Sequence, residues 1–386
     1  MKISIKQIPA IWKITFLINF ILILHIAYFG INYYRGEYSL GVDGMRYRIL
    51  AEEYRTSPTI LGENCKNLFW TPWFILIALL HENPVLVFIF NLFCFTIILY
   101  MLYVLSRDIK LPLFLQILLL LLYGLYWPTF DYLLFYHYEI FLTFIFTGMI
   151  FFLFIFSKRL EQSILPWILL GLFTGVGIFV HPRAFGIFLL GAVFLVSRHK
   201  NIRLWGAKLA VYILFSFLLL FLWGIRNKTV LDRWVFTSDS LGYNLFVGFN
   251  PIARGTFAPQ PPYPPHDQAF ELAKNYILSH PGRSFYLVFL KLVKFWYPSE
   301  AERFGPRIFL IQDYVIILFS LSGLLWAVIS RERSPVIRGM IFLILYYMAF
   351  HAVFYIDIPR FRLPVTPFLC FLSVYIYHKL SRVRES

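Results

Sequence analysis

Two carboxylates stand next to long apolar runs of this sequence, where an ionisable group is costly to bury unless it has a partner or a task. Asp43 lies in the motif GVDGMRYR (residues 41–48), after the first apolar run, and Glu139 stands at the start of a later one. A positioned carboxylate can take a proton from an acceptor hydroxyl. Asp43 and Glu139 are therefore the candidate catalytic residues.

Arginine and lysine residues occur in the same polar segments as these acids. A guanidinium can bind two phosphate oxygens at once, which makes arginine well suited to phosphate, and such charge-assisted hydrogen bonds are stronger than neutral ones. Carboxylates and cations together at a membrane surface suit a lipid that carries phosphate. The cations expected on the same side as these acids are Arg46, Arg48, Lys66, Arg183, Arg226, Arg254, Lys291, Arg360 and Arg362.

Each of these residues also has a structural alternative. A loop acid such as Asp43 is more often a solvated surface group, and Glu139 could cap the helix that it begins. Arg360 and Arg362 could anchor the end of a span by placing their charged heads at the interface. A divalent cation that bridges Asp43 and Glu139 is a further alternative, although the chemistry requires no cofactor.

Membrane helices must position these residues. Of the 386 residues, 60% are hydrophobic and 14% are charged, and a soluble core of this length could not bury so much apolar surface. Many nearly uncharged runs are ~17–22 residues long, which is the length that crosses a bilayer as a helix. Hydrocarbon offers the backbone no partners, so helix is required there. We predict an all-α polytopic membrane protein with one domain over residues 1–386.

About ten spans account for the apolar runs if helices of this length cross the bilayer. Cations fall in the short loops that the positive-inside rule assigns to the cytoplasm, so a cell-membrane protein with cytoplasmic N- and C-termini is expected. The net charge of +15 follows this pattern and does not indicate nucleic acid. Asp131 is expected in a short outer loop. The predicted spans are 11–30, 85–105, 111–127, 139–157, 164–180, 184–196, 205–224, 308–329, 339–355 and 363–380.

The two long outer loops, 31–83 and 225–306, contain further predicted elements. Residues 69–81 are apolar but too short to cross, so they favour an interfacial helix. Residues 283–297 carry lysine among aromatic side chains and also predict an interfacial helix. Residues 241–255 are expected to form turns.

Several motifs together resemble the GT-C membrane glycosyltransferases, and within them the bacterial group similar to protein O-mannosyltransferases and the lipid A aminoarabinose transferase. The most specific match is the segment LGYNLFVGFNP at residues 241–251, whereas Trp70 stands where some relatives carry an acid. The resemblance covers nearly the whole chain. Its motifs are, in chain order, 43–47 (DGMRY), 70–73 (WTPW), 138–139 (YE), 181–183 (HPR), 226–227 (RN), 241–251 and 360–364 (RFRLP).

The resemblance implies a GT-C-like helical bundle that transfers a sugar from a polyprenyl-phosphate donor to a lipid, glycan or protein acceptor on the outer face of the membrane. Asp43 would be the general base, with inversion at the sugar carbon, and Glu139 would match a second family acid. The donor phosphate would meet cations among Arg183, Arg226, Lys291, Arg360 and Arg362. The sugar or acceptor would meet Tyr47, Tyr243, Asn244 and Asn250.

Two rival functions use similar residues. A transporter or flippase of a lipid-linked sugar would need the same basic headgroup site but no general base. Inverted repeats and broken helices mark many transporters, and the sequence shows no such symmetry. A glycan polymerase or ligase of the outer face would also use arginines of the outer loops.

The topology predicts that both long loops lie on the same side of the membrane. Ser39→Cys and Ser279→Cys, each in a background without Cys65, Cys94 and Cys370, should both react with a membrane-impermeant thiol reagent added outside intact cells. The native cysteines are scattered and predict neither a disulfide framework nor a metal site, so their replacement is a suitable background. Labelling of one position only from the cytoplasmic side would contradict the arrangement.

Overall fold

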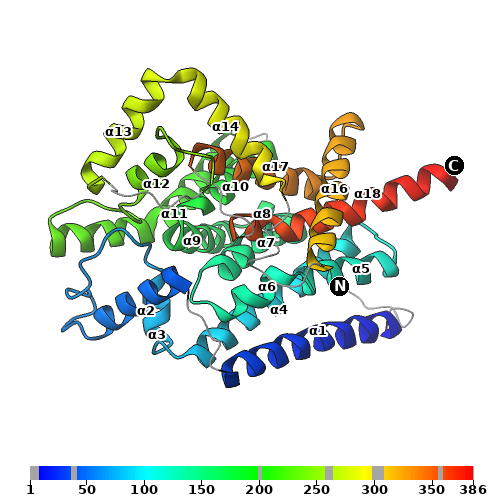
Figure 1. Cartoon of the computed structure of the whole chain (residues 1–386). Helices are drawn as coiled ribbons and strands as arrows, with labels where there is room; N and C mark the ends of the chain where they lie inside the picture. The colour runs from blue at the N-terminus through cyan, green and yellow to red at the C-terminus, as the bar shows by residue number, and fades with distance from the viewer. Residues whose placement is uncertain are drawn as a thin grey trace.

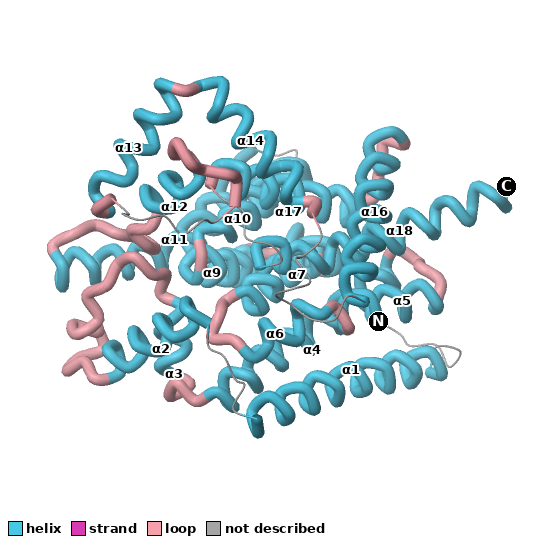
Figure 2. The backbone as a smooth tube through the Cα atoms, in the orientation of Figure 1, coloured by secondary structure: helices cyan, strands magenta, loops and turns pink. Residues whose placement is uncertain are grey.

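The computed structural model describes residues 8–35, 41–198, 202–256, 264–297, 308–354 and 360–385. The regular elements in these ranges are all helices (Figures 1 and 2), which confirms the predicted helical class. Six of them are long and apolar enough to cross a membrane. They are α1 (Ile8–Arg35), α4 (Pro84–Asp108), α11 (Ile202–Leu231), α16 (Ile308–Ile329), α17 (Pro335–Val353) and α18 (Thr366–Glu385).

The remaining predicted spans correspond to shorter or broken helices. The predicted span 111–127 is α5 (Leu113–Gly124), followed by α6 (Trp127–Leu134) at a bend of 49°. Asp131, expected in a loop, lies within α6. Three apolar segments of 10–17 residues follow, which are shorter than the six long helices. The total of about ten membrane spans therefore stays a prediction. The three segments are α7 (Glu139–Ile155), α9 (Leu165–Val180) and η2 (Pro182–Ala184) with α10 (Phe185–Arg198).

Two segments expected as loops are helical. Asp43 lies in the first turn of α2 (Gly41–Arg55). The segment 241–255, which was expected to form turns, begins with α12 (Leu241–Gly248). Helix α2 buries Tyr47, Leu50 and Ala51, which stand at helical spacing, and it packs on α3 (Trp73–Leu79). The apolar face of α2 is narrow, and its many charged residues concealed the helical period.

Most of the other helices lie within the segments predicted as outer loops. Helix α3 falls within the expected interfacial segment, and α13 (His266–Ser279) is followed by α14 (Pro281–Phe295). Helix α8 (Ser157–Gln162) connects α7 to α9. In Figure 1, α2, α3, α12 and α13 lie toward one end of the molecule, at the left, and the end of α18 lies at the other.

Close packing joins α9 to α11. A Cβ atom at Gly175 would lie 2.8 Å from the backbone oxygen of Ser216, and one at Gly171 would lie 3.0 Å from the backbone oxygen of Tyr212. These glycines therefore let the two helices approach more closely than larger residues would allow, as small residues do in membrane helix pairs. The prediction that this glycine-rich span packs closely is confirmed.

The centre and the periphery of the bundle differ in exposure. Phe368, Leu369 and Phe371 of α18 are fully buried, whereas Trp12 and Phe16 of α1 are 70% and 75% exposed. Large exposed apolar side chains are a liability in water but suit a surface that faces lipid. The burial pattern therefore agrees with a membrane-embedded bundle.

A buried ion pair joins the C-terminal segment to α16. In η3 (Arg360–Val365), Arg362 Nη2 lies 2.6 Å from Asp313 Oδ1, and both side chains are 1% exposed. Arg362 Nη1 also donates to the carbonyl oxygen of Tyr297 (2.7 Å), and the Tyr126 hydroxyl donates to Asp313 (3.0 Å). A buried charge needs such a complete set of partners to be tolerated.

Asp313→Asn should destabilise the folded protein by about 3–5 kcal/mol, because it leaves the buried guanidinium without its counter-charge. The measurement is reversible unfolding in mixed detergent micelles. Replacement of both partners, Arg362→Met with Asp313→Leu, is the control, and it should lie closer to the wild type. Equal stability of the Asn variant and the wild type would contradict a paired, buried charge.

Candidate functional site

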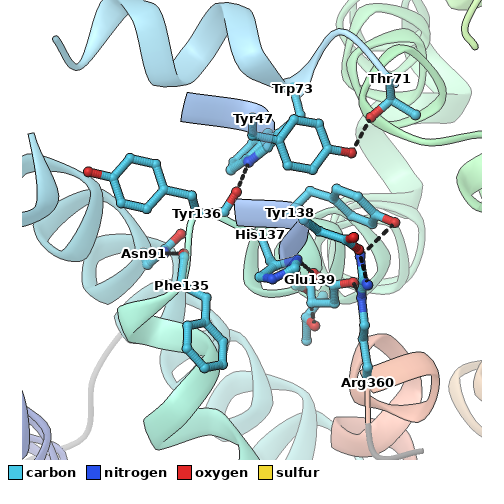
Figure 3. Close-up of polar contacts among 12 residues, drawn as sticks. Tyr47, Thr71, Trp73, Asn91, Phe135, Tyr136, His137, Tyr138, Glu139 and Arg360 are labelled. Atoms are coloured by element: carbon cyan, nitrogen blue, oxygen red, sulfur yellow. Dashed lines mark hydrogen bonds and ion pairs between the residues drawn. The ribbon is translucent and has the colours of Figure 1, made fainter. Parts of the chain in front are cut away.

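One guanidinium bridges the two predicted catalytic acids. Arg360 Nε donates to Glu139 Oε1 at 2.5 Å, and Arg360 Nη1 donates to Asp43 Oδ2. Figure 3 shows Arg360 reaching toward Glu139 and Tyr138. The structure therefore brings together three residues that lie far apart in the sequence, since Asp43 and Arg360 are 317 positions apart.

Three elements position this triad. Asp43 and Glu139 each occupy the first turn of a helix, α2 and α7 respectively, where the helix dipole favours a negative charge. Arg360 begins η3, which packs against α7. Each charged group therefore stands at the end of an element, where the backbone direction can aim it at the other two.

The segment before Glu139 is held by hydrogen bonds from two other helices. Trp73 Nε1 of α3 donates to the carbonyl oxygen of Tyr136 (2.8 Å), and Asn91 Nδ2 of α4 donates to that of Phe135 (3.3 Å). Both contacts are drawn in Figure 3. Because the backbone just before α7 is anchored in this way, His137, Tyr138 and Glu139 take a defined orientation.

The charges of the triad keep Asp43 ionised at neutral pH. Burial raises the pKa of Asp43, but the positive charge of Arg360 and its hydrogen bond act in the opposite direction, and the pKa lies below its usual value. Burial lowers the pKa of His137 to about 4, so this ring is neutral at pH 7. A cation bridging Asp43 and Glu139 would have to displace the guanidinium that already links them.

The triad opens onto a pocket of about 500 Å³. Ligand sites of this size, with aromatic walls and a few polar groups, are typical of small-molecule recognition. The side chain of Asp43 is 27% exposed and that of Arg360 is 14% exposed, whereas Glu139 is fully buried. Of the predicted site residues, the pocket is lined by Asp43, Tyr47, Arg183, Tyr243, Asn244 and Arg360.

Arg183 is a second cation of the pocket, and its hydrogen-bonding capacity is not filled. It lies in η2, 6% exposed, with its guanidinium 3.9 Å from the centre of the Phe361 ring. Its Nε and Nη1 have no hydrogen-bond partner among the residues that the structure describes. Its backbone N–H donates to His181 Nδ1 (3.1 Å), which orders the turn. Buried donors are normally satisfied, so two unpartnered donors on a residue that lines a pocket point to an anionic ligand.

Arg226 is not part of this pocket. Its Nε donates to the carbonyl oxygen of Leu61 (2.6 Å), and its Nη2 donates to those of Gly62 and Cys65, the latter at 2.7 Å. Its Nη1 donates to the Asn227 side chain (2.8 Å). The guanidinium therefore fastens the loop between α2 and α3, and Arg226 does not line the pocket.

Three other predicted residues also lie outside the lining of the pocket. Arg362 is used in the pair with Asp313 described above. Asn250 Nδ2 donates to the carbonyl oxygen of Phe246 (2.8 Å) and closes the end of α12. Lys291 is fully buried with its Nζ 3.7 Å from the centre of the Phe249 ring, and burial lowers the pKa of this amine to about 7.

The sequence analysis did not assign several other residues that line the pocket to the site. Trp70 and Tyr138 were noted only as parts of motifs. Ser238 and Ser240 could not be distinguished in the sequence, because single hydroxyl side chains are common in loops. His351 lies inside an apolar run, where a packed histidine is expected, yet it lines the pocket and its ring stacks on Phe361 with centroids 4.6 Å apart.

Comparison of the chain with models of known protein families found no match, and a search of curated proteins found none either. The chemistry of the site is therefore inferred from the residues that line the pocket.

Removal of the bridging charge should give the protein a new pH dependence. In the wild type the lowered pKa of Asp43 contributes stability that is lost only as the pH falls through the carboxyl range, about 4. In Arg360→Met the main cationic partner of Asp43 is lost and only the smaller effect of the Arg183 charge remains, so burial raises the pKa of the Asp43 carboxyl above its usual value. Stability of the variant should then fall as the pH rises from 5 to 8, and at pH 8 the loss should reach about 3–5 kcal/mol.

Thermal unfolding in detergent at pH 5 and pH 8 measures this difference. Arg360→Lys is the matched control, because it keeps one positive charge and should show little dependence on pH over this range. If Arg360→Met were as stable at pH 8 as at pH 5, the two acids would not depend on this guanidinium.

Proposed function

We propose that this protein is a glycosyltransferase that moves a sugar from a polyprenyl-phosphate donor to a hydroxyl group of an acceptor. The observation that carries the proposal is that one pocket is lined both by a buried guanidinium with open donors, Arg183, and by an ionised, partly exposed carboxylate, Asp43. The first suits the phosphate of a donor, and the second suits an acceptor hydroxyl.

The donor phosphate would bind at Arg183, with Arg360 as a second contact. Among the residues that the structure describes, Arg360 Nη2 contacts only the Tyr138 hydroxyl, at 3.5 Å, so it keeps capacity for a ligand. When the bond between the sugar carbon and the phosphate oxygen breaks, negative charge grows on the departing polyprenyl phosphate. Fixed cations at this position stabilise that charge without needing to reorganise.

The acceptor hydroxyl would attack the sugar carbon from the face opposite the phosphate, which gives inversion. Its proton would pass to Asp43, since Glu139 is fully buried and only Asp43 can be reached from the pocket. A carboxylate held by Arg360 is a weak base, so transfer depends on the oxygen becoming acidic as the new bond forms. Glu139 would act by holding Arg360 in place, and a metal ion is not needed for this scheme.

The surroundings of the pocket agree with a lipid-linked donor. Phe350 and Phe354 at the end of α17 line it together with Phe361, and apolar walls of this kind suit the first isoprene units. The long apolar helices place the protein in a membrane, where such a donor resides. In the proposal the pocket opens on the outer face of the cell membrane.

Asp43→Asn should lower turnover at least ~10²-fold while donor binding stays nearly intact, because the amide keeps the shape but cannot accept the proton. The measurement is product formation by purified protein in detergent from a panel of radiolabelled polyprenyl-phosphate hexoses, beside a direct donor-binding assay. Near-wild-type transfer by the Asn variant would refute the role of Asp43 and make Glu139 the next candidate.

Arg183→Gln is the comparison variant in the same experiment. It should weaken donor binding by one to two decades, since a charged hydrogen bond contributes roughly 1.5–3 kcal/mol. Donor binding without product from any donor or acceptor, together with movement of the lipid across a bilayer, would instead indicate a transporter.

A further inference from the structure

A second cleft adjoins the pocket, and its lining carries a net positive charge. It has a volume of about 610 Å³ and is lined by the cations Arg46, Lys66 and Arg233 and by the acid Asp239. Arg233 Nη2 pairs with Asp239 Oδ2 at 2.6 Å. Arg46 and Lys66 make no hydrogen bond or ion pair within the part of the chain that the structure describes. We call this feature the basic cleft.

The basic cleft and the pocket share a wall. Phe69 and Trp70 line both of them. On α2, Asp43 lines the pocket and Arg46, three residues later, lines the cleft. Side chains at this spacing lie on neighbouring turns, with Cβ atoms about 5–6 Å apart, so one small molecule could contact both.

The far side of the cleft is tied to this wall. The backbone N–H of Asp239 donates to the carbonyl oxygen of Leu68 (2.7 Å), which joins the connection between α11 and α12 to the segment before α3. The ion pair with Asp239 fixes the Arg233 head in the same region. The cleft therefore lies between two connected parts of the chain, and its cations Arg46 and Lys66 have no partner among the described residues.

We propose that the basic cleft is the acceptor subsite and that it selects acceptors carrying an anionic group, phosphate or carboxylate. The inference rests on the proposed function. The anionic group would contact Arg46 and Lys66, and the hydroxyl would reach past Trp70 to Asp43. Arg183 does not line the cleft, so the donor phosphate and the acceptor anion would occupy separate cation sites, as attack opposite a leaving phosphate requires.

Direct binding tests the cleft independently of transfer. Glucose 6-phosphate should bind the purified protein in low salt, as measured by calorimetry, whereas glucose should not. In Arg46→Glu/Lys66→Glu, affinity for glucose 6-phosphate should fall about ten-fold or more, as expected for two partly exposed charge contacts. Arg48→Glu/Arg55→Glu is the matched control, because it makes the same change in charge on and near α2 but outside the cleft lining. Equal binding by all three proteins would overturn the proposal.

A transfer assay tests the role as an acceptor subsite. Pairs of acceptors that differ only in charge, such as glycerol 3-phosphate and glycerol, should differ in KM, with the charged member favoured. The double variant in the cleft should raise KM for the charged acceptor about ten-fold and leave donor KM and kcat unchanged. Transfer without any preference for charge, unaffected by the variant, would refute the inference while the proposed glycosyltransferase stands.

Two further outcomes separate the alternatives. Glucose 6-phosphate binding that depends on the cleft, without transfer from any donor, would overturn both the acceptor role and the proposed function and would leave an anion-binding cleft. A separate measurement compares how well the wild type and the cleft variant retain phosphatidylglycerol and phosphatidylcholine in nanodiscs. If the cleft variant lost only phosphatidylglycerol and bound glucose 6-phosphate normally, the cations would contact membrane lipid, and the proposal would be wrong.

Discussion

The bridge from Arg360 to Asp43 and Glu139 is the interaction on which the site depends. Burial raises the pKa of the Asp43 carboxyl, and the charge and hydrogen bond of Arg360 offset this and keep Asp43 ionised. The guanidinium fork suits this task because it can donate to both acids at once. Since α2, α7 and η3 each supply one member, the bridge also fixes how the N-terminal, central and C-terminal parts of the bundle meet at the pocket.

Three buried arginines, Arg183, Arg226 and Arg362, differ in whether their donors are satisfied within the described part of the chain. Arg226 and Arg362 direct their donors to backbone carbonyls and to Asn227 or Asp313, so they hold the fold together. Arg183 is equally buried and lines the pocket, but two of its donors have no partner among the residues that the structure describes. An unsatisfied buried donor is costly in the empty protein, and a bound anion would remove that cost. This difference, more than the presence of arginine, marks the proposed phosphate site.

The pocket and the basic cleft, which share Phe69 and Trp70, are lined by three kinds of group: the cations Arg46 and Lys66, the partly exposed carboxylate Asp43, and the buried guanidinium of Arg183. In the proposed reaction these would hold the acceptor anion, the attacking hydroxyl and the leaving phosphate respectively. The aromatic residues Phe69 and Trp70 separate the first two and would limit what passes between them. Acceptor choice would then depend on charge and on the size of the unit between anion and hydroxyl.

The sequence by itself determined the helical class, the apolar segments and much of their boundaries, as with α16, which spans residues 308–329 as predicted. It also paired Asp43 with Glu139 and marked the glycine-rich packing of α9. These properties depend on hydropathy and spacing, which are local in the chain. Only the tertiary structure decided that Arg360 bridges the acids, that two buried donors of Arg183 have no partner among the described residues, and that Arg226, Arg362 and Asn250 bond to other parts of the protein. Those roles depend on which polar atoms arrive from other parts of the chain, up to 317 residues away, and no local pattern carries that information.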